Sequence, residues 1–119
     1  MIALDPRGAA RTAVAANPAR PAMAILHDSP DARLVVFRLA PGQAVAPHRS
    51  ASTVQLEVLE GTGVLSGERD GTSADRACAA GDVVVYTPNE LHGMRAGDGE
   101  LLLLATITPR PDARCCSGS

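Results

Sequence analysis

Lysine and tryptophan are absent from this chain, and large aromatic side chains are scarce. All eleven basic residues among its 119 are arginines. A chain without lysine has no lysine side chain to form a Schiff base with a carbonyl substrate, and it cannot supply the lysine that a P-loop or a protein kinase uses on phosphate. Phe37 and Tyr86 are its only large aromatic residues, too few to stack the bases of single-stranded nucleic acid.

The chain also lacks an excess of positive charge and a long apolar segment. Its formal net charge is -2 at pH 7, which gives no attraction toward phosphate backbones or anionic lipid. A membrane-spanning helix needs about 18 consecutive apolar residues, whereas the longest apolar segment, Leu101 to Ile107, is short and predicts a buried strand. We therefore expect no nucleic-acid partner and no membrane association.

The three cysteines are too few and too unevenly placed for a disulfide framework. Cys78 stands alone, and Cys115 and Cys116 are adjacent near the end of the chain. An odd count in this arrangement favours a reducing compartment, so we expect a cytoplasmic protein. The arginine-only, alanine-rich composition further suggests a bacterial genome rich in GC.

The spacing of apolar runs and turn residues predicts an all-β protein. The length suits one domain, and apolar or β-branched runs alternate with Gly, Pro, Asp and Asn at the spacing of an antiparallel sandwich or barrel. We predict an N-terminal arm over 1–22, with a turn or two of helix over 11–16, then a β domain over 23–108 and a flexible tail over 109–119. The expected strands are 23–27, 33–39, 44–48, 54–60, 63–66, 74–79, 82–87, 92–95 and 100–108.

Two segments with fixed glycine and histidine spacing carry the strongest functional signal. In the first, five residues separate Gly42 from His48, and six residues separate Val54 from Gly61. This segment resembles the first cupin motif, G-x5-H-x-H-x3,4-E-x6-G. The second segment, from Gly81 to His92, resembles the second cupin motif, G-x5-P-x-G-x2-H-x3-N, with its proline one place late at Pro88 and with Asn89 and Ala96 at the later glycine and asparagine positions.

The resemblance covers about residues 33–107 and implies a small RmlC-like cupin, a jelly-roll barrel also called a double-stranded β-helix. In this family, two histidines from the first motif, its glutamate and a histidine from the second motif surround a metal. His48 and His92 stand at the first and third histidine positions, whereas Ser50 and Val54 replace the second histidine and the glutamate. Two of the four expected metal ligands remain.

The resemblance therefore leaves three hypotheses for the barrel pocket. The preferred one is that His48, Ser50, Val54, Gln55 and His92 line a pocket that binds a small, weakly polar molecule. The second is a metal-dependent enzyme of the dioxygenase, isomerase or decarboxylase type that uses His48 and His92 as ligands of a weakly held divalent metal (zinc, nickel, iron or manganese). The third is a structural or regulatory protein, in which the two histidines are hydrogen-bonded core residues without a ligand.

Several other residues are candidates for the pocket. Gln55 has the wrong parity to face inward on a regular strand, but a bulge before Val54 could turn it. Glu90 could reach the barrel mouth, although we expect it to be solvated. Arg38 and Arg95 could anchor an anionic ligand, although solvated strand arginines are commoner. We expect His27 to be a surface residue, Arg49 to point outward to a carboxylate, and Cys78 to be buried.

The pocket wall should be aliphatic, with Val45, Leu56, Val58 and the 83–85 strand supplying most of it. The resemblance also implies a homodimer, because single-domain cupins commonly pair by extending a sheet or by exchanging N-terminal strands.

Overall fold

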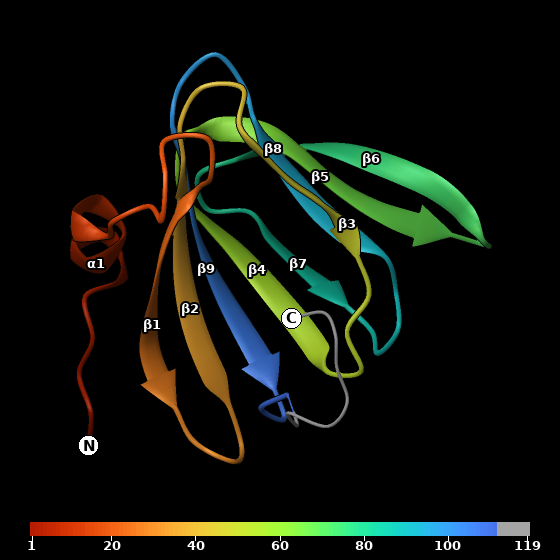
Figure 1. Cartoon of the computed structure of the whole chain (residues 1–119). Helices are drawn as coiled ribbons and strands as arrows, with labels where there is room; N and C mark the ends of the chain where they lie inside the picture. Colours follow the sequence, from red (N-terminus) through yellow and green to blue (C-terminus); the bar gives the residue numbers. More distant parts are fainter. Residues whose placement is uncertain (112–119) are drawn as a thin grey trace.

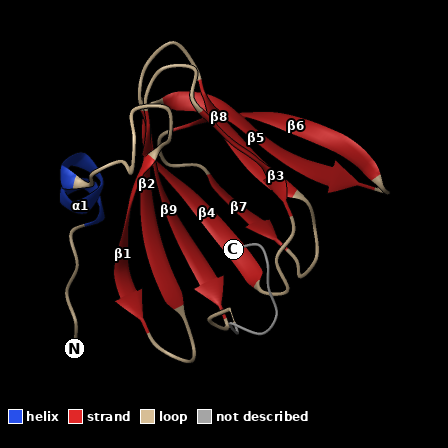
Figure 2. Ribbon diagram, in the orientation of Figure 1, coloured by secondary structure: helices blue, strands red, loops and turns tan. Residues whose placement is uncertain are grey.

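Nine strands make up two antiparallel sheets that face each other across the core, as Figures 1 and 2 show. The structure is a computed structural model and describes residues 1–111; the tail cysteines, Cys115 and Cys116, lie outside the described residues. All nine strands expected from the sequence are present, and the all-β prediction is confirmed. Their bounds are β1 (Ala22–Asp28), β2 (Arg33–Leu39), β3 (Ala44–His48), β4 (Thr53–Glu60), β5 (Thr62–Arg69), β6 (Thr72–Ala79), β7 (Val83–Tyr86), β8 (His92–Ala96) and β9 (Leu101–Thr108).

The strand order is that of a jelly roll. One sheet has the order β1-β2-β9-β4-β7 and the other has the order β3-β8-β5-β6, so strands distant in sequence become neighbours. The turn between β4 and β5 requires a glycine: Gly61 has a φ of 90°, and a Cβ there would overlap the carbonyl oxygen of Glu100. Gly61 is the last glycine of the first motif. The motif has a glycine at this position because the turn requires a backbone conformation that other residues rarely adopt.

The main core lies between the two sheets, where the inward-facing residues of each strand meet. Strand β9 runs through the centre of the larger sheet between β2 and β4, and Leu101 and Leu103 on its inner face are fully buried. Leu65 and Met94 cover them from the smaller sheet. The two-residue alternation of strands thus places one aliphatic face of each sheet against the other.

The N-terminal arm packs a short helix against the outer face of the larger sheet. The helix α1 (Pro6–Thr12) buries Ala10 completely in a second cluster with Val36, Leu59 and Leu102. The sequence predicted a helical turn at 11–16, and that position was wrong. Asp5 starts the helix earlier, because its side chain accepts the Gly8 N–H at 3.1 Å and Pro6 follows it in the first turn.

Arg38 fixes the end of α1 to the sheet. Its guanidinium donates hydrogen bonds to the carbonyl oxygens of Ala10, Arg11 and Ala13 at 2.6, 2.7 and 3.1 Å. These are carbonyls that a helix end leaves without intrahelical partners. The expectation that Arg38 could anchor an anionic ligand was therefore wrong: it sits on the outer face of β2 and holds the arm.

Among residues 1–111, no helix has the length and apolar composition needed to cross a membrane.

Candidate functional site

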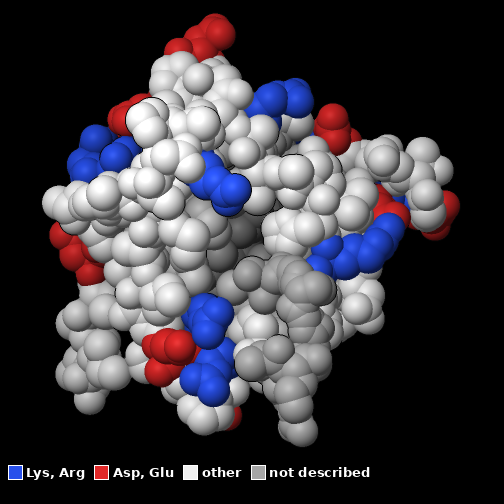
Figure 3. Space-filling view, viewed as in Figure 1, with Lys and Arg blue, Asp and Glu red and all other residues white. Residues whose placement is uncertain are grey.

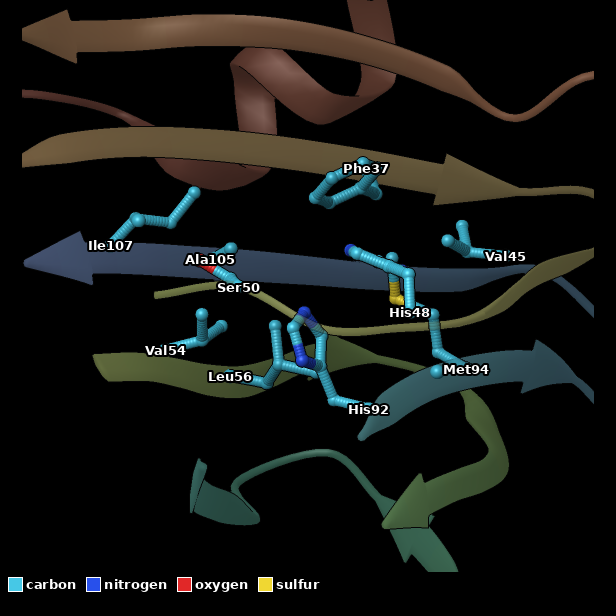
Figure 4. A pocket seen from close by; sticks show the side chains of 11 residues that line it. Phe37, Val45, His48, Ser50, Val54, Leu56, His92, Met94, Ala105 and Ile107 are labelled. Atoms are coloured by element: carbon cyan, nitrogen blue, oxygen red, sulfur yellow. The ribbon is translucent and has the colours of Figure 1, made fainter. Parts of the chain in front are cut away.

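A pocket lies between the two sheets at the end of the barrel where β3 and β8 carry the histidines. The space-filling view in Figure 3 shows a hollow between the sheets, and Figure 4 shows the lining side chains from close by. The pocket has a volume of about 60 Å³. Its lining comes from five strands and the segment after β3: Phe37, Val45, His48, Ser50, Val54, Leu56, His92, Gly93, Met94, Ala105 and Ile107.

The strand register brings His48 and His92 together. They are directly opposed residues of β3 and β8, with their ring centroids 4.2 Å apart and their planes inclined by 58°. The motif alignment predicted that both rings share one pocket, although they are 44 positions apart in sequence. The structure places both rings in its lining, and Figure 4 shows them close to each other below Phe37.

Both imidazoles are held in the same way by the backbone. The Nδ1 of His48 lies 3.1 Å from the carbonyl oxygen of Ala46, and the Nδ1 of His92 lies 3.2 Å from that of Glu90. A carbonyl oxygen only accepts hydrogen bonds, so each contact requires a proton on Nδ1. In the neutral imidazole this leaves Nε2 without a proton and free to accept a hydrogen bond or to bind a metal.

His92 is the more deeply placed of the two histidines. It is 7% exposed, and its ring centroid lies 5.1 Å from that of Tyr86, which covers its other side. Burial lowers the pKa of His92 below its ordinary value of 6.5, since desolvation penalises the imidazolium, and the neighbouring His48 acts in the same direction. His92 is therefore a neutral hydrogen-bonding group at pH 7.

Ser50 and Val54, the residues that replace two family ligands, also line the pocket. Ser50 is 7% exposed and its Oγ accepts the N–H of Ser52 at 3.1 Å. Val54 is 4% exposed and belongs to the main hydrophobic core. The two ligand positions of the motif thus line the pocket, Ser50 from the segment between the strands and Val54 from β4, but they present a hydroxyl and a methyl surface.

Gln55 and Glu90 are not among the residues that line the pocket, so the expectation for Gln55 was wrong, whereas Glu90 lies outside the pocket as its favoured, solvated alternative predicts. Strand β4 keeps a regular register from Val54 to Val58, with its only irregularity between Val58 and Glu60. Gln55 is consequently exposed on the outer face. The Glu90 carboxylate accepts the backbone N–H of Thr87 at 3.0 Å, which closes the turn before β8.

The aliphatic wall of the pocket comes from other strands than the sequence predicted. Val45 and Leu56 line it as expected, whereas Val58 lies deeper in the core. Val83 and Val85 are 52% and 58% exposed on the outer face of β7. The lining residues that the sequence analysis missed lie on β2, β8 and β9; they are Phe37, Gly93, Met94, Ala105 and Ile107. The alternation along β9 could have predicted that Ala105 and Ile107 face inward. It could not have shown which inward-facing residues line the pocket and which pack in the core.

Glu68, which the sequence analysis overlooked, joins the two segments that carry the histidines. Its carboxylate accepts hydrogen bonds from the Arg49 guanidinium at 2.6 and 3.2 Å and from the Leu91 N–H at 2.8 Å. Arg49 follows His48 and Leu91 precedes His92, so one side chain fixes both loops. Arg49, and secondarily the Leu91 N–H, hold the pKa of Glu68 below its ordinary value. The expectation that Arg49 points outward to a carboxylate is confirmed.

The remaining candidates lie elsewhere. His27 is part of β1, and Arg95 is exposed on β8 beside the inward-facing Met94; neither lines the pocket. Cys78 is buried, as expected, and burial raises the pKa of its thiol. An unreactive structural thiol is the consequence.

The side chains present do not fit a resident metal ion of the usual kind. A catalytic zinc site takes about three protein ligands, and a non-haem iron site takes two histidines and a carboxylate. Within residues 1–111, no group of three or more His, Cys, Asp and Glu side chains is arranged to hold a metal. His48 and His92 offer two nitrogens, and the carboxylate position is the buried Val54.

Solved structures provide the comparison that decides the family. An RmlC-like cupin from Desulfovibrio desulfuricans is 30% identical, with a TM-score of 0.70 over 82% of this chain and 91% of the other. The chain belongs to the RmlC-like cupins. Two further similar structures are a predicted oxalate decarboxylase from Thermotoga maritima, 28% identical with a TM-score of 0.68 over 75% of this chain and 80% of the other, and an uncharacterised double-stranded β-helix protein from Klebsiella pneumoniae, 20% identical with a TM-score of 0.73 over 84% and 86%.

Sequence comparison alone finds less for this cupin. No protein-family model matches the chain, and no curated protein matches it. The loss of two of the four ligand positions removes the residues by which the first motif is most readily recognised. The spacing of its glycines and of His48 and His92 still places the barrel correctly.

Proposed function

We propose that this cupin binds a small, weakly polar molecule in the pocket between its sheets. The observation that carries the proposal is the composition of the lining: two paired histidines and one serine hydroxyl sit within a wall that is otherwise apolar. Small-molecule sites are typically apolar, with a few polar groups that fix the orientation of the ligand. Here these groups are His48, His92 and Ser50, gathered on one side of the pocket.

The volume of the pocket limits what can enter it. An enclosed apolar cavity of about 150 Å³ holds benzene, and this pocket measures about 60 Å³. A fragment of roughly two or three heavy atoms therefore fits, by proportion to the six of benzene in that cavity. A larger ligand, such as 2-propanol or a phenol, would place its polar end against the histidines and leave the remainder at the mouth.

The test is a thermal-shift screen of short alcohols, ketones, carboxylates and phenols, run with a chelator and again with added zinc, nickel, iron or manganese. Stabilisation by a ligand in the presence of chelator supports the proposal, because binding to the native state alone raises the melting temperature. Stabilisation that requires a metal contradicts it and supports the alternative, a metal-dependent cupin enzyme that uses His48 and His92. If no ligand stabilises the protein with chelator or with metal, the result contradicts both the binding function and the enzyme function and favours a structural role.

A matched pair of variants assigns any ligand to the pocket. Val45→Phe adds bulk to a side chain in the lining, whereas Ala44→Phe adds the same ring to the exposed neighbouring position on β3. We expect Val45→Phe to abolish the shift and Ala44→Phe to retain it. Equal shifts in the two variants would mean that the ligand binds elsewhere.

We also propose that the protein forms a homodimer through β1. This strand is an edge of the five-stranded sheet, and Met23 and Ile25 are 49% and 52% exposed on it. Their register partners are Phe37 and Val35, so the two side chains continue the apolar inner face of the sheet beyond the area that the smaller sheet covers. A second copy of this strand offers the same apolar surface and a complementary set of backbone hydrogen-bonding groups.

A further inference from the structure

We propose that the histidine pair makes the pocket selective for a neutral hydroxyl group, so that a small alcohol binds in preference to the ketone or the carboxylate of the same size. This inference rests on the proposed function and specifies the ligand class. It follows from which ring nitrogen of each histidine is already occupied.

The backbone assigns the same role to both rings. Each Nδ1 donates its proton to a carbonyl oxygen two residues earlier in the chain, that of Ala46 for His48 and that of Glu90 for His92. In its neutral form, each ring then has one acceptor atom, Nε2, for a ligand that lies against the pair. A ligand must bring a proton to be held, and an O–H group brings one.

Ser50 complements this pair. Its Oγ already accepts the N–H of Ser52 at 3.1 Å, which leaves its hydroxyl proton as the group's available donor. An alcohol oxygen both donates and accepts, so it can donate to an Nε2 and accept from Ser50. A ketone oxygen only accepts, and it would leave both histidine acceptors without a partner in a partly dry site.

A carboxylate is disfavoured more strongly than a ketone. Among the described residues that line the pocket, none has a permanent positive charge. Arg38 is bonded to the end of α1 and Arg49 to Glu68, so neither of these guanidinium groups supplies a counter-charge in the pocket. An anion would lose its hydration and face two lone pairs with no counter-charge.

Direct measurement of the tautomers tests the premise in the unmodified protein. Long-range proton–nitrogen NMR correlation distinguishes a ring protonated at Nδ1 from one protonated at Nε2. We expect the Nδ1–H form for His48 and His92 at neutral pH; His27, which does not line the pocket, is the internal reference for an unconstrained ring. An Nε2–H form at both pocket histidines would overturn the proposal, whatever the pocket binds.

The selectivity is measured with 2-propanol, acetone and acetate, which have four heavy atoms each and the same branched outline. Titration followed by the ring nitrogen shifts should show 2-propanol binding about five- to tenfold more tightly than acetone, the ratio that corresponds to one hydrogen bond between neutral groups. Acetate should be weaker still. Acetone or acetate binding as tightly as 2-propanol would overturn the selectivity while leaving the proposed function intact, and binding of none of the three would overturn both.

Variants of the histidines complete the experiment. His48→Phe removes one acceptor from the half-buried ring and keeps an aromatic side chain there, and His27→Phe makes the same change outside the pocket. We expect His48→Phe to remove most of the preference for 2-propanol over acetone and His27→Phe to preserve it. A preference unchanged in His48→Phe and in the corresponding His92→Phe variant would overturn the proposal; if either variant fails to fold, the tautomer measurement on the unmodified protein still decides.

Discussion

The variant Tyr86→Phe should be less stable than the natural protein near neutral pH and more stable than it at high pH. Tyr86 is 5% exposed in the core beside His92, and its hydroxyl donates to the Ser66 carbonyl at 2.9 Å. Burial, with a smaller contribution from the charge of Glu90, raises its pKa from 10.0 to about 12. The folded protein therefore resists ionisation of a phenol that ionises readily once the chain unfolds.

The magnitude follows from linkage between protonation and folding. A group whose pKa is raised in the folded state contributes stability that is fully present below its unfolded pKa and is lost as the pH rises through the folded one. For Tyr86 this window runs from pH 10.0 to about 12. At its upper end about 2 kcal/mol has been lost, since each pH unit between the two values corresponds to 1.36 kcal/mol.

The phenylalanine variant has no phenol to ionise, so it does not lose this stability at high pH. It also lacks the hydrogen bond to Ser66. Near neutral pH we expect it to be about 1 kcal/mol less stable than the natural protein. The two stability curves should then cross at about pH 10.7, where the linkage loss equals the hydrogen-bond loss.

Urea unfolding followed by far-ultraviolet circular dichroism, at a series of pH values, measures both curves. The near-ultraviolet absorbance of the phenolate provides an independent reading, because the chain contains one tyrosine and no tryptophan. Parallel curves that do not cross up to about pH 12 would refute the reasoning, since they would mean that the phenol gains no protection from the fold. So would a phenolate transition in the folded protein at the same pH as in urea.

Two further predictions concern the missing metal ligands and the dimer. Ser50→His combined with Val54→Glu should complete a four-ligand shell and raise the affinity for zinc, nickel or iron by several orders of magnitude in calorimetric titration; an affinity equal to that of Ser50→His alone would show that position 54 does not reach the metal. Ile25→Lys should convert the dimer to a monomer in light scattering after size exclusion, while Val85→Lys, equally exposed on the opposite edge strand β7, should leave it dimeric.

The fold was predictable because its signals are local and agree with one another. Strand alternation, turn glycines and the spacing from Gly42 to Gly61 each depend on a few neighbouring residues, and together they predicted all nine strands. The helix was misplaced because its position depends on tertiary contacts. Ala10 packs on Val36 and Leu102, and Arg38 binds the helix end from 28 to 25 positions away in sequence; none of this is visible in the sequence around residue 10.

The candidate site was predictable where the motif spacing fixes which residues reach the pocket. His48, Ser50 and Val54 all line it at the motif positions, although Ser50 lies in the segment between β3 and β4, and His92 opposes His48 because β3 pairs with β8. Gln55 was misjudged because a bulge depends on how a strand pairs with its neighbours. Glu68 was missed for a related reason. It belongs to neither motif, and its carboxylate accepts hydrogen bonds from two loops that are distant from it in the sequence.

The substitutions at positions 50 and 54 have a joint consequence for the chemistry of the pocket. With a glutamate at 54, a carboxylate would face the histidines and favour their protonated or metal-bound forms. Val54 removes that influence, and the burial of His92 then favours the neutral ring. The carbonyls of Ala46 and Glu90 still hold both Nδ1 protons, as the outer partners of metal-binding histidines commonly do. Without a carboxylate, this retained arrangement leaves two inward-facing acceptors, and a group that donates a hydrogen bond satisfies them as a metal ion would.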